Sequence, residues 1–134
     1  MRLTHLADYA DVMLTAAARR PATERLSAAV LSDETGVPLP TAQKLMGMLA
    51  NAGLLTSTRG AQGGYLLTRA AAAISLADIV EAVEGPIALT LCSGNEGVSD
   101  CALDARCRIK PHMGVVGNAV RGALDAVTLQ ELAQ

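Results

Sequence analysis

Phenylalanine and tryptophan are absent from this chain of 134 residues, and only two tyrosines are present. The core must therefore be aliphatic, and the abundance of alanine, leucine and methionine favours helices because these residues have high helix propensity. No run approaches the roughly 20 consecutive apolar residues that a membrane span requires, and the amino-terminus lacks a signal-peptide pattern. We therefore expect one compact, cytoplasmic domain that does not associate with membranes.

Cysteine is also scarce, with only Cys92, Cys101 and Cys107 in the chain. An odd number of cysteines in a reducing compartment argues against a disulfide framework and leaves metal binding or redox sensing. No phosphate loop of the G-x-x-x-x-G-K type occurs, and His5 and His112 lie in no nucleophile or base motif. We therefore predict that the protein is not an enzyme.

Charge is distributed unevenly along the chain. Residues 1–70 carry seven Lys/Arg against five Asp/Glu, a net charge of +2, whereas the remainder carries four against eight, a net charge of −4. Acidic surfaces repel nucleic-acid phosphates. Any DNA-binding surface is therefore expected in the first half, and any dimer or sensor surface in the second.

Capping residues and apolar periodicity predict the helices of the first half. Thr4 caps a helix that must end before Pro21, and Ser27 caps a short helix that stops at Gly36. A third helix is predicted over about residues 41–51. Two short helices joined by a tight turn are typical of a helix-turn-helix.

Two short strands are predicted next, over residues 54–58 and 65–68, around a glycine-rich hairpin tip at residues 59–64. Ser75 opens a fourth helix through a capping box with Asp78. Helix, helix, turn, helix and hairpin is the order of a winged helix-turn-helix. We therefore predict a mainly α fold with a small β-hairpin wing.

The winged-helix order assigns candidate DNA contacts. The second helix of the motif enters the major groove and the wing grips the backbone or minor groove, so polar side chains at these places are able to contact bases or phosphates. Arg59, at the start of the glycine-rich hairpin tip, suits a narrow groove. A solvated helix start and an ordinary hairpin tip are the alternatives. The candidate DNA contacts in these two elements are Thr41, Gln43, Lys44, Arg59, Gly60 and Gln62, and Arg2 at the amino-terminus is a further candidate.

The second half contains a loop and then a long helix. Residues 90–110 have neither helical nor strand periodicity, and Pro111 suits a helix start. The helix has one apolar stripe, which either completes the core or contacts a second subunit, and glycines at 114, 117 and 122 favour a close partner helix. Thr128 opens a last turn. The predicted organisation is a winged helix at 1–85, a cysteine loop at 86–110 and a dimerisation helix with a C-terminal turn at 111–134. The stripe consists of Met113, Val116, Val120, Leu124 and Val127.

The chain resembles the bacterial winged-helix regulators typified by IscR and NsrR. The opening residues Met1-Arg2-Leu3-Thr4, Tyr9, the wing Arg59–Leu67, residues 79–85 and the three cysteines carry the resemblance. Residues 84–90 and Lys110-Pro111-His112 look closest to members that regulate the SUF cluster-assembly operon. The resemblance implies a homodimer on a pseudo-palindromic DNA operator, with DNA binding set by the state of an iron–sulfur cluster near the dimer interface.

The spacing Cys92-x8-Cys101-x5-Cys107 lacks the C-x-x-C pairs of structural zinc sites, and thiolates suit an iron–sulfur cluster. A cluster usually takes four protein ligands, so the three thiols leave one ligand unassigned. IscR-like members place a histidine three residues after the last cysteine, where this chain has Lys110, which cannot ligate as an ammonium. Some NsrR-like members use an aspartate from the first helix of the other subunit, which here matches Asp8.

His112 is a rival ligand within the chain, and either residue could instead be only a solvated side chain. The nuclearity, 2Fe-2S or 4Fe-4S, stays open. The resemblance therefore implies a transcriptional regulator, either a repressor or an activator, that senses cluster status or redox or nitrosative stress and controls iron–sulfur assembly genes. The alternative is a cluster-free winged-helix regulator that senses thiol redox state or binds zinc.

Overall fold

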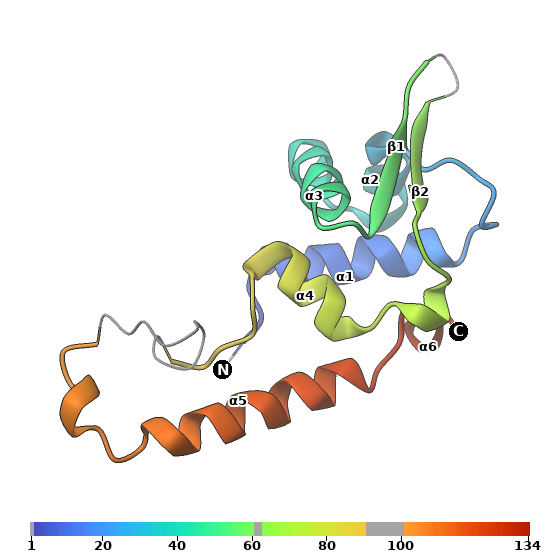
Figure 1. Ribbon diagram of the computed structural model, residues 1–134. Helices are drawn as coiled ribbons and strands as arrows, with labels where there is room; N and C mark the ends of the chain where they lie inside the picture. The colour runs from blue at the N-terminus through green and yellow to red at the C-terminus, as the bar shows by residue number, and fades with distance from the viewer. Residues whose placement is uncertain (1, 61–62, 91–100) are drawn as a thin grey trace.

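A computed structural model describes residues 2–60, 63–90 and 101–134 of the chain (Figure 1). The described residues are mainly helical with one small sheet, which confirms the predicted fold class. None of the helices in these three ranges combines the length and apolarity needed to cross a lipid bilayer. The elements are α1 (His5–Ala18), α2 (Ala28–Thr35), α3 (Leu39–Asn51), β1 (Leu55–Thr58), β2 (Gly64–Leu67), η1 (Ala71–Ala73), α4 (Leu76–Glu84), η2 (Asp104–Arg106), α5 (Lys110–Asp125) and α6 (Leu129–Leu132).

Side-chain caps begin four helices at the predicted residues. The Thr4 hydroxyl accepts a hydrogen bond from the backbone N–H of Ala7 at 3.2 Å, and Ser27 caps α2 in the same way. Ser75 and Thr128 each form a reciprocal capping box. Because each cap satisfies a backbone donor that the helix itself cannot, these four starts follow from local sequence.

The start of α3 differs from the prediction. The helix begins at Leu39, two residues before the expected start, with Pro38 as its N-cap and Pro40 in the first turn. Proline is compatible with a first turn because the N–H that it lacks would have no partner within the helix there.

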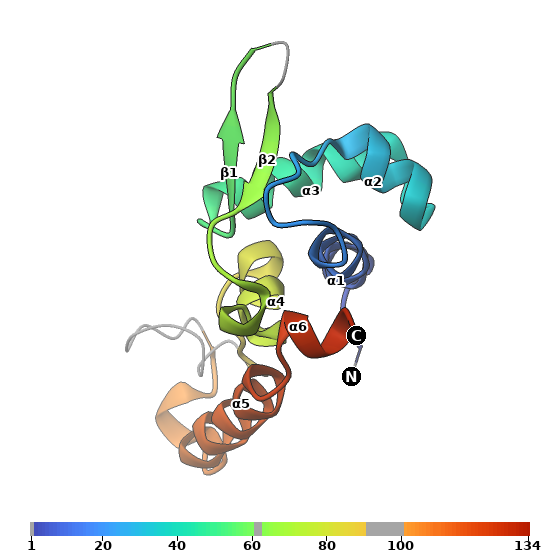
Figure 2. The same ribbon diagram turned by 90° about the vertical axis from the view of Figure 1, so that its right-hand side faces the viewer.

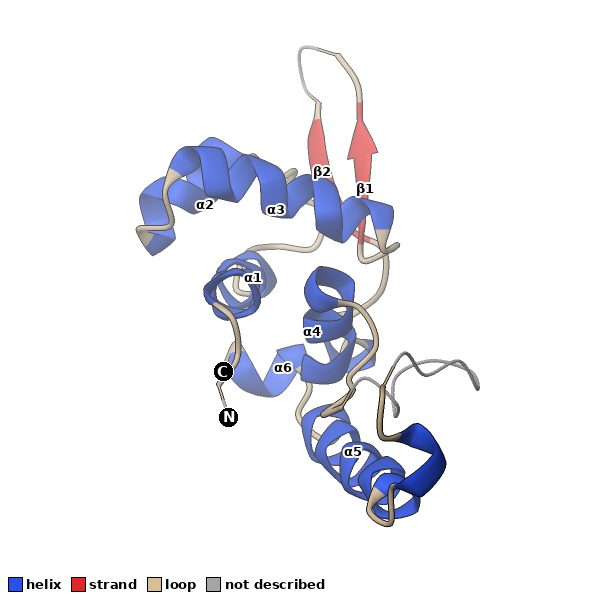
Figure 3. Cartoon of the chain, turned by 90° about the vertical axis from the view of Figure 1, so that its left-hand side faces the viewer, coloured by secondary structure: helices blue, strands red, loops and turns tan. Residues whose placement is uncertain are grey.

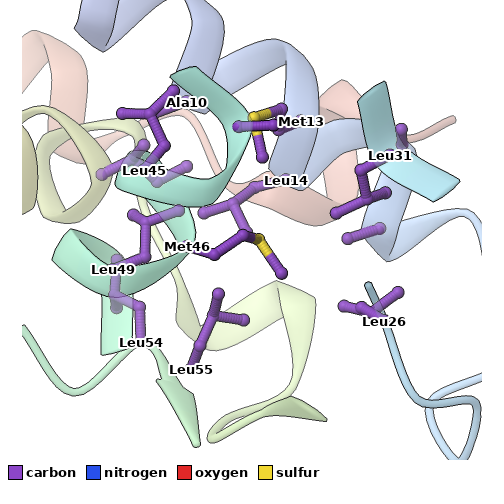
Figure 4. Close-up of a cluster of buried hydrophobic side chains, with 14 of the residues drawn as sticks. Ala10, Met13, Leu14, Leu26, Leu31, Leu45, Met46, Leu49, Leu54 and Leu55 are labelled. Atoms are coloured by element: carbon purple, nitrogen blue, oxygen red, sulfur yellow. The ribbon is translucent and has the colours of Figure 1, made fainter. Parts of the chain in front are cut away.

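An aliphatic core forms where α1, α2 and α3 meet the base of the hairpin (Figure 4). No aromatic side chain among the described residues is fully buried, as the composition predicts. Ile74 and Ile79 of the α4 region and Leu129 of α6 join the same cluster. Its largest fully buried side chains are Met13, Leu14, Leu31, Leu45, Met46, Leu49, Ile74, Ile79 and Leu129.

The strands β1 and β2 form an antiparallel hairpin, with Leu55 opposite Leu67 and Thr58 opposite Gly64. Leu26 pairs with Tyr65 on the outer side of β2 through two backbone hydrogen bonds of 2.8 Å. A Cβ at Gly64 would lie 2.8 Å from the Leu26 carbonyl oxygen, so this close approach requires glycine. Figure 3 shows the strands confined to one end of a helical molecule.

The long helix α5 lies at the end of the molecule opposite the hairpin (Figures 1 and 2). The chain then returns to the main body, where the N–H of Leu76 donates to the carbonyl of Val127 and the N–H of Leu129 donates to that of Ile74, both at 2.8 Å. Leu129 is fully buried. The last helix therefore shares the core of the first four.

Candidate nucleic-acid interface and cysteine segment

A tight turn sets the direction of α3 relative to α2. Gly36 ends α2 in the left-handed conformation, with φ of +83°, and its N–H donates to the Ser32 carbonyl at 2.9 Å. The Ser32 hydroxyl donates to the Val37 carbonyl at 2.6 Å. These bonds satisfy backbone groups within the turn and hold α2 and α3 in a helix-turn-helix.

One face of α3 packs into the core and the other faces outward. Leu45 and Leu49 are buried, whereas Gln43 and Lys44 are exposed and Thr41 is half-buried. The three polar residues predicted to contact DNA therefore lie together in the first two turns of α3. An amide, an ammonium and a hydroxyl provide both donors and acceptors for base edges and phosphates.

Arg59 follows β1 directly and is exposed on the projecting hairpin (Figure 1). Gly60 has φ of +107°, a conformation that favours glycine, and its carbonyl accepts from the N–H of Gly63 at 2.8 Å. A Cβ at Gly63 would lie 2.6 Å from the Thr58 carbonyl oxygen. The glycines thus keep the turn narrow while Arg59 supplies a cation. Gln62, also predicted as a contact, lies outside the described residues.

Arg2 lies apart from the other candidate DNA contacts. It is exposed, and together with Val120 and Leu124 it lines a groove of about 360 Å³ beside α5. The hairpin and α5 are at opposite ends of the molecule (Figure 2). A DNA contact by Arg2 therefore stays a prediction from the sequence alone.

The cysteine segment leads directly into α5. Cys101 and Cys107 are half-buried on either side of η2, whereas Cys92 lies outside the described residues. The apolar side chains of Leu103 and Ile109 beside them are 69% and 59% exposed. Large apolar exposure of this kind is typical of a surface that contacts another group or chain.

The two candidates for the fourth ligand are both exposed. Asp8 lies in the first turn of α1, and His112 lies in the first turn of α5. Within residues 2–60, 63–90 and 101–134, no three His, Cys, Asp or Glu side chains form a group that could hold a metal ion. The predicted set, however, includes Cys92 and the partner subunit's Asp8.

Asp11 is a half-buried acidic residue that was not predicted from the sequence. Burial, and then the negative charges of Asp8 and Glu84, raise the pKa of Asp11 from 3.8 to about 7. Its Oδ1 atom is buried and has no hydrogen-bond partner among the residues that the structure describes. The Thr4 N–H donates to Glu84 at 3.0 Å and so joins the ends of α1 and α4 at this acidic corner. Because Asp11 is three residues before the core residue Leu14, helical spacing already indicated partial burial.

Polar contacts connect the carboxyl-terminal half of α5 to α4. The Ser75 hydroxyl, which also caps α4, donates to Asp125 at 2.7 Å. Arg121 contacts Glu81 at 2.7 Å. Ser75 and Asp125 are 50 positions apart, so no local pattern could have predicted this contact. These bonds join the helix that follows the cysteines to the helix that follows the wing.

Comparisons with known proteins agree with this architecture. A family model described as "Rrf2: Iron-dependent Transcriptional regulator" matches residues 3–134. The HTH-type transcriptional regulator IscR of Photorhabdus laumondii subsp. laumondii is 31% identical over 132 residues, which cover 98% of this chain and 79% of the relative. Relatives of this kind confirm the prediction of a transcriptional regulator rather than an enzyme.

Two solved structures show the same arrangement. CymR (YrzC), the global cysteine regulator of B. subtilis, is 28% identical with a TM-score of 0.72, covering 99% of this chain and 96% of its own. The oxidized form of Staphylococcus aureus CymR is 27% identical with a TM-score of 0.71, covering 100% of this chain and 97% of its own. These structures confirm the winged-helix fold.

Proposed function

Because the chain belongs to the Rrf2 family of DNA-binding transcriptional regulators, we propose that it is a homodimer that senses an iron–sulfur cluster held by Cys92, Cys101 and Cys107. One observation carries this proposal. Cys101 and Cys107 lie half-buried immediately before α5, and the far end of α5 is hydrogen-bonded to α4, which follows the wing. A conformational change at the cysteines can therefore reach the DNA-binding half, through the chain that continues into α5 and through the hydrogen bonds between α5 and α4.

The DNA contacts follow from the exposed surfaces of α3 and the hairpin. We place Thr41, Gln43 and Lys44 in the major groove, and Arg59, with Gly60 and Gln62, against the minor groove or backbone. Arg59→Ala should weaken operator binding by about 1–3 kcal/mol in gel-shift titrations at fixed salt. Arg19→Ala is the matched control, because it removes the same charge from an exposed position outside α3, the hairpin and the cysteine segment. Equal affinities of both variants would remove Arg59 from the interface.

Gln43 provides a separate test of base reading. An exposed glutamine amide can pair with adenine through two hydrogen bonds, so Gln43→Ala should relax sequence preference more than it lowers overall affinity. Affinities for a set of single-base operator variants measure this difference. A uniform loss across all sequences would show that Gln43 contacts only the backbone.

The homodimer explains the exposed apolar face of α5. Val115 and Val116 are 69% and 44% exposed. A Cβ at Gly114 would meet nothing within 4 Å. A second copy of α5 would bury this face, and two-fold symmetry would then produce a pseudo-palindromic operator. Val116→Arg should shift the molecular mass in solution toward that of a monomer, as measured by sedimentation. An unchanged mass would place the interface elsewhere.

The available ligands fit an iron–sulfur cluster. Three soft thiolates suit iron, and the missing fourth ligand is assigned to Asp8 of the partner subunit in preference to His112. A bound cluster would supply a site that reacts with oxidants or nitric oxide. The chain itself supplies the thiolates, of which Cys101 and Cys107 are half-buried on either side of η2, and the segment that carries them continues into α5.

Cluster binding has a direct spectroscopic test. Anaerobically purified protein should be brown and contain iron and sulfide, and replacing any of the three cysteines with Ala should abolish the visible spectrum. Asp8→Ala should alter the spectrum or speed cluster loss in air, because one iron position opens. If His112→Ala has these effects and Asp8→Ala has none, the cluster is completed within one chain.

A second candidate function is a thiol or zinc sensor without a cluster. It is favoured by the similarity to a CymR structure in an oxidized form, and by the half-buried thiols of Cys101 and Cys107. Colourless anaerobic protein that contains zinc or gains a disulfide on oxidation would establish it.

For the cluster sensor we further propose repression of iron–sulfur assembly genes. A gel shift on the promoter of such an operon tests whether the protein binds there.

A further inference from the structure

The amino-terminal tip of α3 is apolar and exposed. Leu39 is 41% exposed, and Pro38 and Pro40 on either side of it are also exposed. The N-cap makes no side-chain hydrogen bond, and both prolines lack a backbone N–H. The tip therefore has few of the donors that usually let a helix start bind phosphate. A tip without these donors is better suited to contact an apolar group.

Leu39 lies one helical turn before Gln43. Residues four positions apart are neighbours on the helix surface, so these two side chains follow one another along α3. Ala42, three residues after Leu39, is buried in the core. Leu39 therefore lies at the boundary between the packed face of α3 and its outward face. In a helix-turn-helix, the first residues of this helix enter the groove and meet the base edges.

We propose that Leu39 is a specificity-determining residue that recognises a thymine through the C5 methyl group. Thymine alone presents a methyl group in the major groove, and apolar side chains are its natural contacts. The recognised base pair would neighbour the one that Gln43 contacts. This inference rests on the proposed placement of α3 in the major groove. It assigns a sequence preference to a residue that has no polar atoms in its side chain.

The test removes the methyl group from the DNA rather than the side chain from the protein. Operators are first selected from a random DNA pool with the wild-type chain, and each thymine is then replaced singly by deoxyuridine. Wild-type protein should lose roughly fourfold in affinity at one thymine of each half-site, the effect expected for one buried methyl. Leu39→Ala should bind the thymine and deoxyuridine operators equally. Leu132→Ala is the control, because Leu132 is similarly exposed, at 37%, but lies on α6.

The outcomes are distinct. Equal wild-type affinity for thymine and deoxyuridine at every position overturns the inference, and this arm needs no protein variant that has to fold. Retained discrimination by Leu39→Ala also overturns it and assigns the methyl contact to another residue. Wild-type protein that selects no operator would contradict the proposed placement of α3 itself. The expected result is that Leu39→Ala no longer discriminates between thymine and deoxyuridine, whereas Leu132→Ala still does.

Discussion

The two ends of α5 differ in how they contact the rest of the chain. At its carboxyl end, Asp125 and the residues after it are hydrogen-bonded to Ser75 and its neighbours, and Leu129 is fully buried. At its amino end, Ile109 and Val115 are largely exposed. The contrast shows that one end of the segment belongs to the folded core of a single chain. The other end has an apolar surface that, in the proposed dimer, a second chain covers.

The largest expected effect on stability comes from the residues that follow the carboxyl end of α5. Leu129→Ala should lower the free energy of unfolding by about 2–5 kcal/mol, because it leaves a cavity in the core shared with α1 and α4. Val115→Ala, at the exposed end, should change it by less than about 0.5 kcal/mol when both changes are made in the monomeric Val116→Arg variant, in which no second chain covers this face. Urea denaturation at one fixed protein concentration measures both. Equal losses would show that the two ends contribute similarly to the fold.

Ser75→Ala should have the next largest effect, about 1–2 kcal/mol. The hydroxyl caps α4 and also donates to Asp125, so its removal loses a helix cap and a contact between α4 and α5. Asp125→Ala is the matched variant, because it breaks the second contact and leaves the cap. Thermal melts should rank Ser75→Ala below Asp125→Ala. The reverse order would mean that the contact to α5 dominates.

Asp11 makes stability depend on pH at the acidic corner of α1 and α4. A folded pKa of about 7 against 3.8 means that the folded chain holds this proton while the unfolded chain releases it. Stability from this group therefore falls as pH rises from about 4 to about 7, and the loss is complete above that range. Asp11→Asn should be more stable than wild type by about 1–2 kcal/mol near pH 8, allowing for partial exposure.

The difference between Asp11→Asn and wild type should shrink as the pH falls below the unfolded pKa of 3.8, where the Asp11 carboxyl is mostly protonated in both the folded and the unfolded chain. Paired denaturation curves across this range measure it. Asp33→Asn is the control, since Asp33 is exposed on α2. A difference that does not change with pH would assign the effect of Asp11→Asn to packing rather than to charge.

The smallest expected effect concerns the ion pair between Arg121 and Glu81. Both side chains are partly exposed, so a double-mutant cycle with Arg121→Ala and Glu81→Ala should yield a coupling energy of about 0.2–1 kcal/mol. High salt should reduce it. A coupling energy well above this range would show that this part of α5, like its carboxyl end, contributes substantially to the free energy of unfolding.

Much of the fold was predictable because the deciding interactions are local. Thr4, Ser27, Ser75 and Thr128 cap helices through hydrogen bonds to residues only three positions away, and the hairpin follows from glycines at its turn. The family resemblance was recognisable for the same reason, since wing residues and cysteines form continuous or closely spaced motifs. Gln43 and Lys44 were predicted as polar side chains near the start of the second helix of the motif, and both are exposed on α3.

The sequence by itself thus determined the order of the elements, their caps and the outward face of α3, because each depends on residues within about one helical turn. Only the tertiary structure decided that Leu26 pairs with Tyr65, that Leu129 enters the core, and that Ser75 meets Asp125. These contacts join residues far apart in the chain, and their partners are chosen by packing. The raised pKa of Asp11 has the same origin, because burial and the charge of Glu84 exist only once α1 lies against α4.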